Sequence, residues 1–386
     1  MSLHRKAAIA GIAELPPRRE TPGETTLGLI AKVGARAVQD AALTANDIDG
    51  LFVGTQVGET PQHVAVTVAE YLGLQPSVAE LVDLGGASAA GMVWRAAAAI
   101  SAGMCTTALC VLANTREAGY APRSPNRNPI REFDVPYGAS GANTSYALIA
   151  QRYLHEYGLQ PEHLAYVPVV ERQNAQLNPD AIFYGKPITV EDVLASPLVA
   201  DPLHLLEIVM PCAGGAALVV TSTDRAGHLP HPPVTLLGAG ERATHRAVSS
   251  APTLTSSPLA QAVADAYEMA HISPADLDVL ALYDCYSVLV LITLEDAGIC
   301  PRGSAAAWLR ENDVSHHGRQ ALNPHGGQLG CGQADLAGGM GHIVEAVRQL
   351  RGEAGERQHA TARLALVTGN GATMGEEAAL ILEGLR

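Results

Sequence analysis

The feature that most constrains the fold of this chain is a repeat between its two halves. Residues 35–51 align without gaps on residues 264–280, and each stretch reads as a helix, a turn with Asp-x-Asp and a short buried strand. In a looser second pair, a Gly-Met dipeptide begins a helix, at 91–92 and again at 339–340, and an apolar strand follows. Two related α/β halves are therefore predicted within the 386 residues.

Short apolar runs alternate with longer helical patterns in both halves, which is typical of sheets covered by helices. The helix expected over residues 86–103 is small or apolar nearly all round. A helix without a polar face has to be buried, so we expect this one to lie in a central layer between two sheets.

Residues 116–201 interrupt the repeat. They are richer in Pro, Asn, Tyr and Arg than the flanking segments, which predicts an inserted, loop-rich subdomain. The division that we expect has a first half at 1–115 plus 206–230, an insert at 116–205 and a second half at 231–386.

Composition excludes several classes of function. A formal net charge of −14 argues against a nucleic-acid partner. No stretch approaches the roughly 18 uninterrupted apolar residues of a membrane span, and the amino end does not read as a signal sequence, so we expect a cytoplasmic protein without a membrane span. The six cysteines and 14 histidines show no metal-binding spacing, so we expect free thiols and no metal site.

Polar residues and glycines gather in three segments near expected strand or helix ends, at 283–287, 323–333 and 369–375. Active sites of α/β folds form at such positions, although each segment alone could be only a tight turn. Two of their residues, Cys285 and Cys331, are candidates for chemistry because they lie in polar, glycine-containing surroundings. A thiolate at Cys285 would be disfavoured by the neighbouring carboxylate, so we expect that thiol to be unreactive, whereas Cys331 stays open as a nucleophile.

Two motifs give these segments a family resemblance. Asn323-x-x-Gly-Gly327 and Tyr283-Asp-Cys-Tyr286, together with the repeat, the insert and the run at 345–352, resemble the thiolase superfamily. The resemblance is strongest to sterol-carrier-type thiolases and lipid-transfer-like proteins. It implies a five-layer αβαβα fold, normally a homodimer, and an acyl-CoA thioester as substrate with no covalently bound cofactor.

The groups on which thiolases depend are missing from this chain. The family carries an acylated cysteine at the amino end of the buried helix, where this chain has Gly86. The histidine of the family's Gly-His-Pro motif is replaced by Gln333, and no cysteine lies around residues 367–371. Glycine cannot form an acyl-enzyme, so thiolysis through position 86 is excluded. Gln333 can donate a hydrogen bond to a thioester oxygen, but it cannot act as an acid or base near pH 7.

One branch of the superfamily supplies an alternative chemistry. It contains retro-aldolases that cleave steroid side-chain CoA thioesters without the cysteine, using an Asp-x-Tyr in this loop and a separate OB-fold partner protein. Asp284-Cys-Tyr286 matches that spacing. Those enzymes also use a tyrosine after the Gly-Gly pair, whereas residues 328–342 contain none, so His325 would have to substitute.

The leading hypothesis is an enzyme that makes or breaks a carbon–carbon bond next to a CoA thioester. Asp284 or Tyr286 would transfer the proton, and Gln333 would hold the oxyanion with backbone amides of the 86–103 helix and of residues 369–371. An alternative is a non-catalytic subunit that binds acyl-CoA or lipid and works with an OB-fold partner. A third reading is acyl transfer through Cys331. The acyl group is not revealed, and Tyr184, Arg123 and Arg127 are possible substrate contacts that could equally lie in a solvated loop.

Overall fold

The computed structural model describes residues 2–55, 63–117, 130–139 and 141–384. Within these residues ten strands form one mixed sheet in the order β10-β9-β11-β12-β8-β1-β7-β4-β2-β3. The strands of the first half are β1 (Ala7–Arg18), β2 (Gly50–Val53), β3 (Val78–Leu81), β4 (Thr107–Asn114) and β7 (Ala213–Ser222). Those of the second half are β8 (Val234–Ala243), β9 (Val279–Ala281), β10 (Ala321–Leu322), β11 (Leu364–Gly371) and β12 (Glu376–Gly384).

The two halves of the sheet follow the same plan. Read outward from their junction, β1-β7-β4-β2-β3 corresponds strand by strand to β8-β12-β11-β9-β10. Only two residue pairs, Ala8 with Thr235 and Ile9 with Val234, join β1 to β8. The predicted repeat is confirmed, because α1 (Thr26–Asp40) precedes β2 as α8 (Leu259–Ala270) precedes β9.

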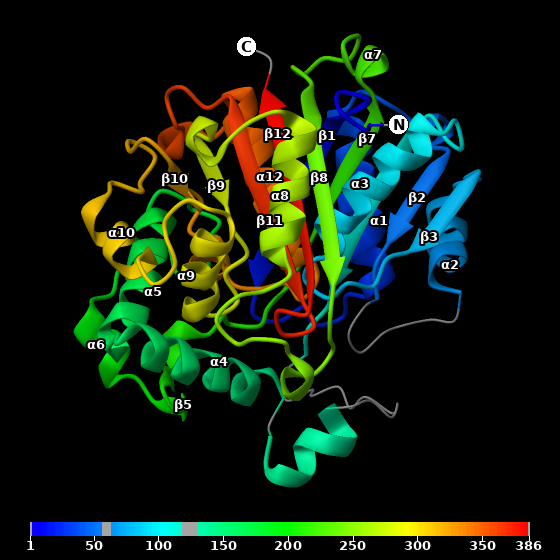
Figure 1. Cartoon of the computed structure of the whole chain (residues 1–386). Helices are drawn as coiled ribbons and strands as arrows, with labels where there is room; N and C mark the ends of the chain where they lie inside the picture. Colours follow the sequence, from blue (N-terminus) through cyan, green and yellow to red (C-terminus); the bar gives the residue numbers. More distant parts are fainter. Residues whose placement is uncertain (1, 56–62, 118–129, 140, 385–386) are drawn as a thin grey trace.

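Helices α3 (Ser88–Ser101) and α12 (Ala337–Arg351) contact strands of both halves and form the predicted central layer. Helix α1, together with α2 (Val64–Leu72), packs on the outer face of the first half, whereas α8 and α9 (Ser287–Asp296) pack on that of the second (Figure 1). The expected five-layer thiolase arrangement is therefore confirmed. It follows from the sequence of α3, whose alanines are buried except for the partly buried Ala98.

The insert differs from the prediction, because the part of it that the structure describes is largely helical rather than loop-rich. It contains α4 (Ala142–Tyr157), α5 (Pro161–Ala175), α6 (Val190–Ala195) and the short strands β5 (Leu198–Ala200) and β6 (Leu203–His204). Polar residues misled the prediction because the helices of the insert bury several of them, including Ser145 in α4 and Glu171, Arg172 and Asn174 in α5. The proline-rich run at 121–129, with Arg123 and Arg127, lies outside the described residues.

The remaining elements are short: η1 (Ala45–Asp47), η2 (Ile130–Asp134), η3 (Val135–Tyr137), η4 (Leu205–Glu207), α7 (Thr223–Ala226), η5 (Val248–Ser250), η6 (Pro274–Asp276), α10 (Ala305–Glu311), α11 (Gly327–Cys331) and η7 (Gly355–Arg357). None of the described helices is both long and apolar enough to cross a membrane. All six cysteines are buried free thiols.

Candidate active site

The loop between β9 and α9, residues 282–286, is held from two sides. Asn323, the first residue of the N-x-x-G-G motif, accepts a hydrogen bond from the amide of Leu282 (2.8 Å) and donates one to its carbonyl (2.9 Å). From the opposite side, the amide of Val209 donates to the carbonyl of Cys285 (3.2 Å). These contacts hold the backbone of the loop, so its side chains are free to point into different parts of the protein.

Tyr283 occupies the space that a side chain at position 86 would need. A Cβ on Gly86 would lie 2.1 Å from the Tyr283 hydroxyl oxygen and 2.5 Å from the carbonyl oxygen of Asn370. Gln333 Nε2 donates a hydrogen bond to the same hydroxyl oxygen (3.0 Å). Burial raises the pKa of Tyr283 well above its usual value, so the group is a neutral phenol. The structure thus brings Gly86 and Gln333 together around a tyrosine.

The backbone amides expected to bind the oxyanion are partly engaged. At the start of α3, the amides of Ala87 and Ser88 donate to the carbonyls of Leu84 and Gly85 (3.1 and 3.0 Å). A Cβ on Gly371, at the end of β11, would lie only 2.0 Å from the Leu84 carbonyl oxygen, so the two backbones are in contact. The Gln333 amide and the Tyr283 phenol are therefore the better placed polar groups at this point.

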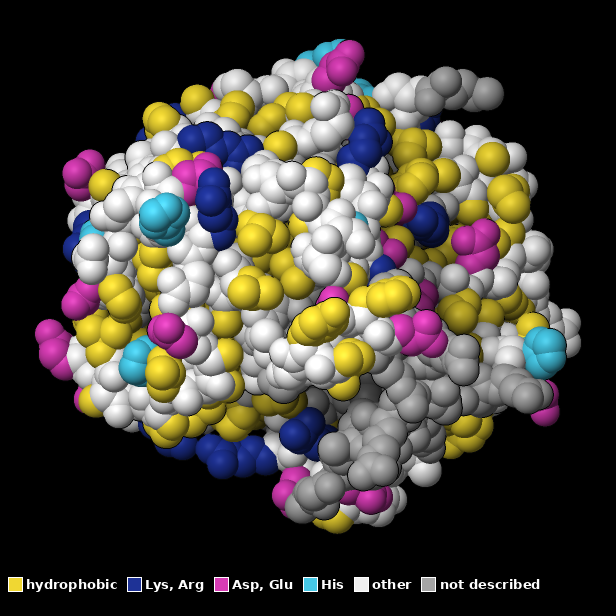
Figure 2. Space-filling model, turned by 60° about the horizontal axis from the view of Figure 1, so that its bottom comes forward, with side chains coloured by type: hydrophobic (Ala, Val, Ile, Leu, Met, Phe, Trp, Pro, Cys, Tyr) yellow, Lys and Arg dark blue, Asp and Glu magenta, His cyan; other side chains and the backbone are white. Residues whose placement is uncertain are grey.

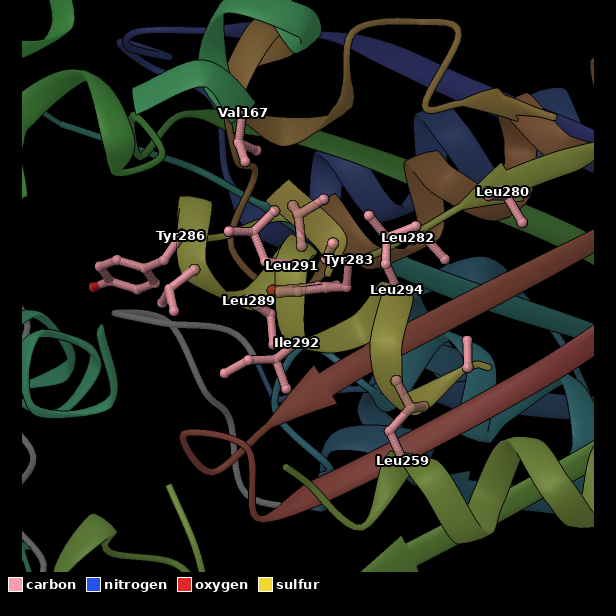
Figure 3. Packing of buried hydrophobic residues seen from close by; sticks show 14 of the residues in the cluster. Val167, Leu259, Leu280, Leu282, Tyr283, Tyr286, Leu289, Leu291, Ile292 and Leu294 are labelled. Atoms are coloured by element: carbon pink, nitrogen blue, oxygen red, sulfur yellow. The ribbon is translucent and has the colours of Figure 1, made fainter. Parts of the chain in front are cut away.

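Tyr286 lies against the insert. Its hydroxyl donates to Asn143 Oδ1 (2.6 Å), and its ring stacks on Tyr146 with centroids 4.0 Å apart and 19° between the planes. Figure 3 shows Tyr286 projecting away from the packed leucines of α9. The Tyr146 hydroxyl in turn donates to Asn370 Oδ1 (2.7 Å), which connects the stacked pair to the strand end beside Tyr283. Burial raises the pKa of Tyr286, which is therefore also a neutral phenol.

Asp284 points in a different direction from Tyr286. Its two carboxylate oxygens accept hydrogen bonds from the amides of Gln328 and Leu329 at the start of α11, both at 2.9 Å. His342 Nε2 of α12 lies 3.0 Å from Asp284 Oδ1. The side chain is completely buried. The structure therefore does not bring Asp284 and Tyr286 together, and Asp284 is placed to anchor the loop.

His325 and Cys331 lie on the Asp284 side of the loop. The His325 ring packs edge-on against His342 (5.2 Å between centroids), and burial lowers its pKa well below the usual value. Cys331 Sγ donates to the His325 carbonyl (3.1 Å). Burial, reinforced by Glu14, raises the pKa of the Cys331 thiol well above its usual range, which disfavours a nucleophilic thiolate. Burial likewise raises the pKa of Cys285, and neighbouring Asp284 adds to the effect.

Three residues of this region were not found from the sequence. Tyr146 belongs to the insert, where spacing alone indicates no contacts. Glu171 of α5 and Glu377 of β12 are buried carboxyl groups, and burial raises the pKa of each well above the usual range. Asn370 Nδ2 donates to Glu377 Oε1 (2.5 Å). Neither carboxyl group stands alone in an apolar element, because Arg172 follows Glu171 in α5 and Glu376 precedes Glu377 in β12, so no sequence signal singled them out.

The face of the molecule at the bottom of Figure 1, where α4 and the β11–β12 turn lie, is shown in Figure 2. Hydrophobic and uncharged side chains cover most of it, with charged side chains scattered among them. Tyr184, considered as a substrate contact, is half exposed.

Comparisons with known proteins agree with the thiolase-like fold, and two of the most similar relatives are named as an aldolase and a lyase. The family model described as "Thiolase C-terminal domain-like" matches residues 240–384. A steroid side-chain-cleaving aldolase of Thermomonospora curvata is 35% identical over 90% of each chain. A 17-hydroxy-3-oxo-4-pregnene-20-carboxyl-CoA lyase of Mycobacterium tuberculosis is 32% identical over 91% of this chain and 92% of that one. A solved structure of an Ltp2-ChsH2(DUF35) aldolase superposes with a TM-score of 0.90 and 33% identity, and the match covers 99% of this chain and 98% of that chain.

Proposed function

The chain belongs to the thiolase superfamily, on the branch that includes sterol carrier protein 2 and steroid side-chain-cleaving aldolases, and from this premise we propose that it cleaves carbon–carbon bonds by a retro-aldol reaction. The substrate in this proposal is a CoA thioester with a hydroxyl group on its β-carbon. The products are a ketone or aldehyde and a shortened acyl-CoA.

Tyr286 is the residue that we assign to proton transfer. As a neutral phenol it accepts the proton of the β-hydroxyl group while it gives its own proton to the α-carbon. In the same step the electron pair of the broken O–H bond forms the new carbonyl, and the electron pair of the broken Cα–Cβ bond passes to the α-carbon. Tyr286 ends the step neutral, so the raised pKa of its phenol is no obstacle.

Gln333 and Tyr283 are the donors that we assign to the thioester oxygen. Charge develops on this oxygen as the Cα–Cβ bond breaks, and a donor already aimed at it lowers the barrier. Asp284 has a positioning role in this proposal, because both of its oxygens already accept hydrogen bonds from α11. His325 lies on the Asp284 side of the loop, packed against His342, so Tyr146 rather than His325 is our candidate for the second tyrosine of the related aldolases.

The observation that most supports this proposal is the position of the Tyr283 hydroxyl, 2.1 Å from the point where a Cβ on Gly86 would lie. A phenol at that point leaves no room for an acyl-cysteine, and it supplies a hydrogen-bond donor there. A reaction that passes through an enolate-like state without a covalent intermediate fits such a site.

We further propose that the chain works in the cytoplasm with a second protein, an OB-fold subunit, and forms a homodimer. Support for a partner comes from the similar Ltp2-ChsH2(DUF35) aldolase, which is named as an enzyme of two components. The free cysteines support a reducing compartment.

The test is a panel of β-hydroxyacyl-CoA thioesters, including a steroid side-chain thioester, incubated with the protein alone and with an OB-fold partner. Chromatography follows the shortened acyl-CoA and the carbonyl product, which should appear in equal amounts. Tyr286→Phe should lower kcat by about 10²–10⁴-fold. Tyr267→Phe is the matched control, because this hydroxyl donates to the Ala297 carbonyl (3.0 Å), at the opposite end of α9 from Tyr286.

Full activity in Tyr286→Phe would contradict the assignment of that residue. Saturable binding of the thioesters without turnover, with and without the partner, would instead support a non-catalytic subunit. The observation that favours this second function is the closed state of the site, in which Tyr283 and Tyr286 are both buried and engaged in hydrogen bonds.

A further inference from the structure

Glu171 and Asp284 are two buried carboxyl groups that meet beside Gly327. A Cβ on Gly327 would lie 2.2 Å from Asp284 Oδ2 and 2.6 Å from Glu171 Oε2, so the two oxygens are at most 4.8 Å apart, the sum of these distances. Both side chains are completely buried, with 0% of each residue exposed. Two ionised carboxylates so close together and away from water repel each other strongly, so one of them should carry a proton.

The hydrogen-bond partners identify which one. Asp284 accepts from two amides of α11 and lies within hydrogen-bond distance of His342, an environment that favours a carboxylate. Glu171 Oε1 accepts from Asn323 Nδ2 (2.9 Å), whereas Glu171 Oε2 has no partner among the described residues. A buried polar atom without a partner is costly, and the nearby Asp284 Oδ2 can only accept. One proton on Glu171 Oε2 turns this pair of acceptors into a donor and an acceptor.

We propose that Glu171 is a neutral carboxylic acid at physiological pH, with its proton on Oε2 facing Asp284, and that this pair positions the loop at 282–286. The link to catalysis rests on the proposed function, because the loop carries Tyr286. Protonation itself does not depend on that function. Burial raises the pKa of Glu171, the charge of Asp284 raises it further, and the hydrogen bond from Asn323 opposes both effects only in part.

Other titratable groups facing the pair come from α11, α12 and the segment before α11. His342 contacts Asp284, and His325 packs against His342 with a lowered pKa that keeps it neutral. Cys331 is a neutral thiol in the same region. His325 and Cys331 therefore supply no positive charge beside the pair, and the ring of His342 is hydrogen-bonded to Asp284.

The proposal predicts a pH dependence with a definite sign. The folded chain holds a proton on Glu171 above about pH 4.3, where an unfolded glutamate loses it. The proton on Glu171 stabilises the folded state fully below about pH 4.3, and this stabilisation is lost as the pH rises through the pKa of Glu171 in the folded protein. Relative to Glu171→Gln, whose amide needs no proton, the unfolding equilibrium of the wild type should therefore shift toward the unfolded state by up to about tenfold per pH unit.

Infrared spectroscopy tests the proton directly and needs no substrate. The spectrum of the wild type minus that of Glu171→Gln at pH 7 should contain the C=O band of a protonated carboxylic acid, shifted in D₂O. The matched control is Glu162→Gln, an exposed position on the same helix, whose difference spectrum should contain only carboxylate bands. If Glu171→Gln does not fold, Glu171→Leu replaces it.

Carboxylate bands alone in the Glu171 difference spectrum would overturn the proposal, as would pH-independent stability of the wild type relative to the variant. A positioning role further predicts that Glu171→Gln retains most turnover and no longer loses activity at the alkaline pH where the wild type does. If the protonated band is present but no thioester is cleaved, the proposed function fails and the protonated pair stands.

Discussion

The tight contact between Gly86 and Tyr283 predicts that the smallest possible side chain at position 86 is already too large. A Cβ there would lie 2.1 Å from the Tyr283 hydroxyl oxygen, 2.3 Å from the ring carbon that bears it and 2.5 Å from the Asn370 carbonyl oxygen. The tyrosine can shift only within a packed site, and the carbonyl belongs to the backbone of β11. Overpacking of this kind costs about 1–3 kcal/mol, and we expect Gly86→Ala at the upper end, near 3 kcal/mol.

The assay is urea unfolding of four proteins that form a double-mutant cycle: wild type, Gly86→Ala, Tyr283→Ala and the double variant. Tyr283→Ala alone should cost about 3–5 kcal/mol, because it leaves a cavity. The methyl group at position 86 can then enter this cavity, so the double variant should be about 1–2 kcal/mol more stable than the two single effects predict when added. Gly227→Ala is the control, because its nearest neighbour would lie 3.5 Å away.

An additive cycle, or a Gly86→Ala variant as stable as the wild type, would refute the reasoning that Tyr283 fills the site. The same geometry predicts that Gly86→Cys alone does not restore an acyl-enzyme, because its thiol has no space beside the phenol. Mass spectrometry after incubation with acyl-CoA should find no adduct at that position.

Three further outcomes are expected. Tyr146→Phe, which keeps the stack on Tyr286 but loses the hydrogen bond to Asn370, should lower turnover less than Tyr146→Ala, as steady-state kinetics of the two variants would show. Wild-type protein incubated with acyl-CoA should carry no covalent acyl group on Cys331, and an adduct in the mass spectrum that disappears in Cys331→Ser would prove otherwise. Asn323→Ala leaves buried backbone groups of the 282–286 loop without partners, so it should lower the free energy of unfolding by about 2–3 kcal/mol. A loss below about 0.5 kcal/mol on urea unfolding would contradict the proposed role of Asn323 in holding this loop.

The general architecture could be predicted because it follows from local patterns of apolar residues along the chain. The repeat of α1 and β2 in α8 and β9 has the same spacing in both halves, and a helix as uniformly apolar as α3 can only be central. The helical insert was missed because its prolines and polar residues suggested loops. Helical order there depends on buried faces that pack on α9, which no local pattern reveals.

The candidate site was predictable only in part, for the same reason. The loop with Asp284 and Tyr286 could be proposed because glycines and polar residues mark the ends of strands, and Gln333 because its segment resembles a thiolase motif. The directions in which Asp284 and Tyr286 point could not be predicted, because a loop has no fixed period that assigns its residues to faces. The contact of Tyr283 with Gly86 joins residues of opposite halves, so neither spacing nor composition could indicate it.

The narrow junction between β1 and β8 has a consequence for how this protein is made. β1 leaves the ribosome well before both of its neighbours, because β7 and β8 begin only at residues 213 and 234. While the roughly two hundred residues between β1 and β7 are translated, the apolar β1 segment has no partner strand on either edge. Unpaired strand edges of this kind promote aggregation of nascent chains or binding of chaperones. Slow translation across the insert would lengthen that interval, so the yield of folded protein should depend on synthesis rate as well as on final stability.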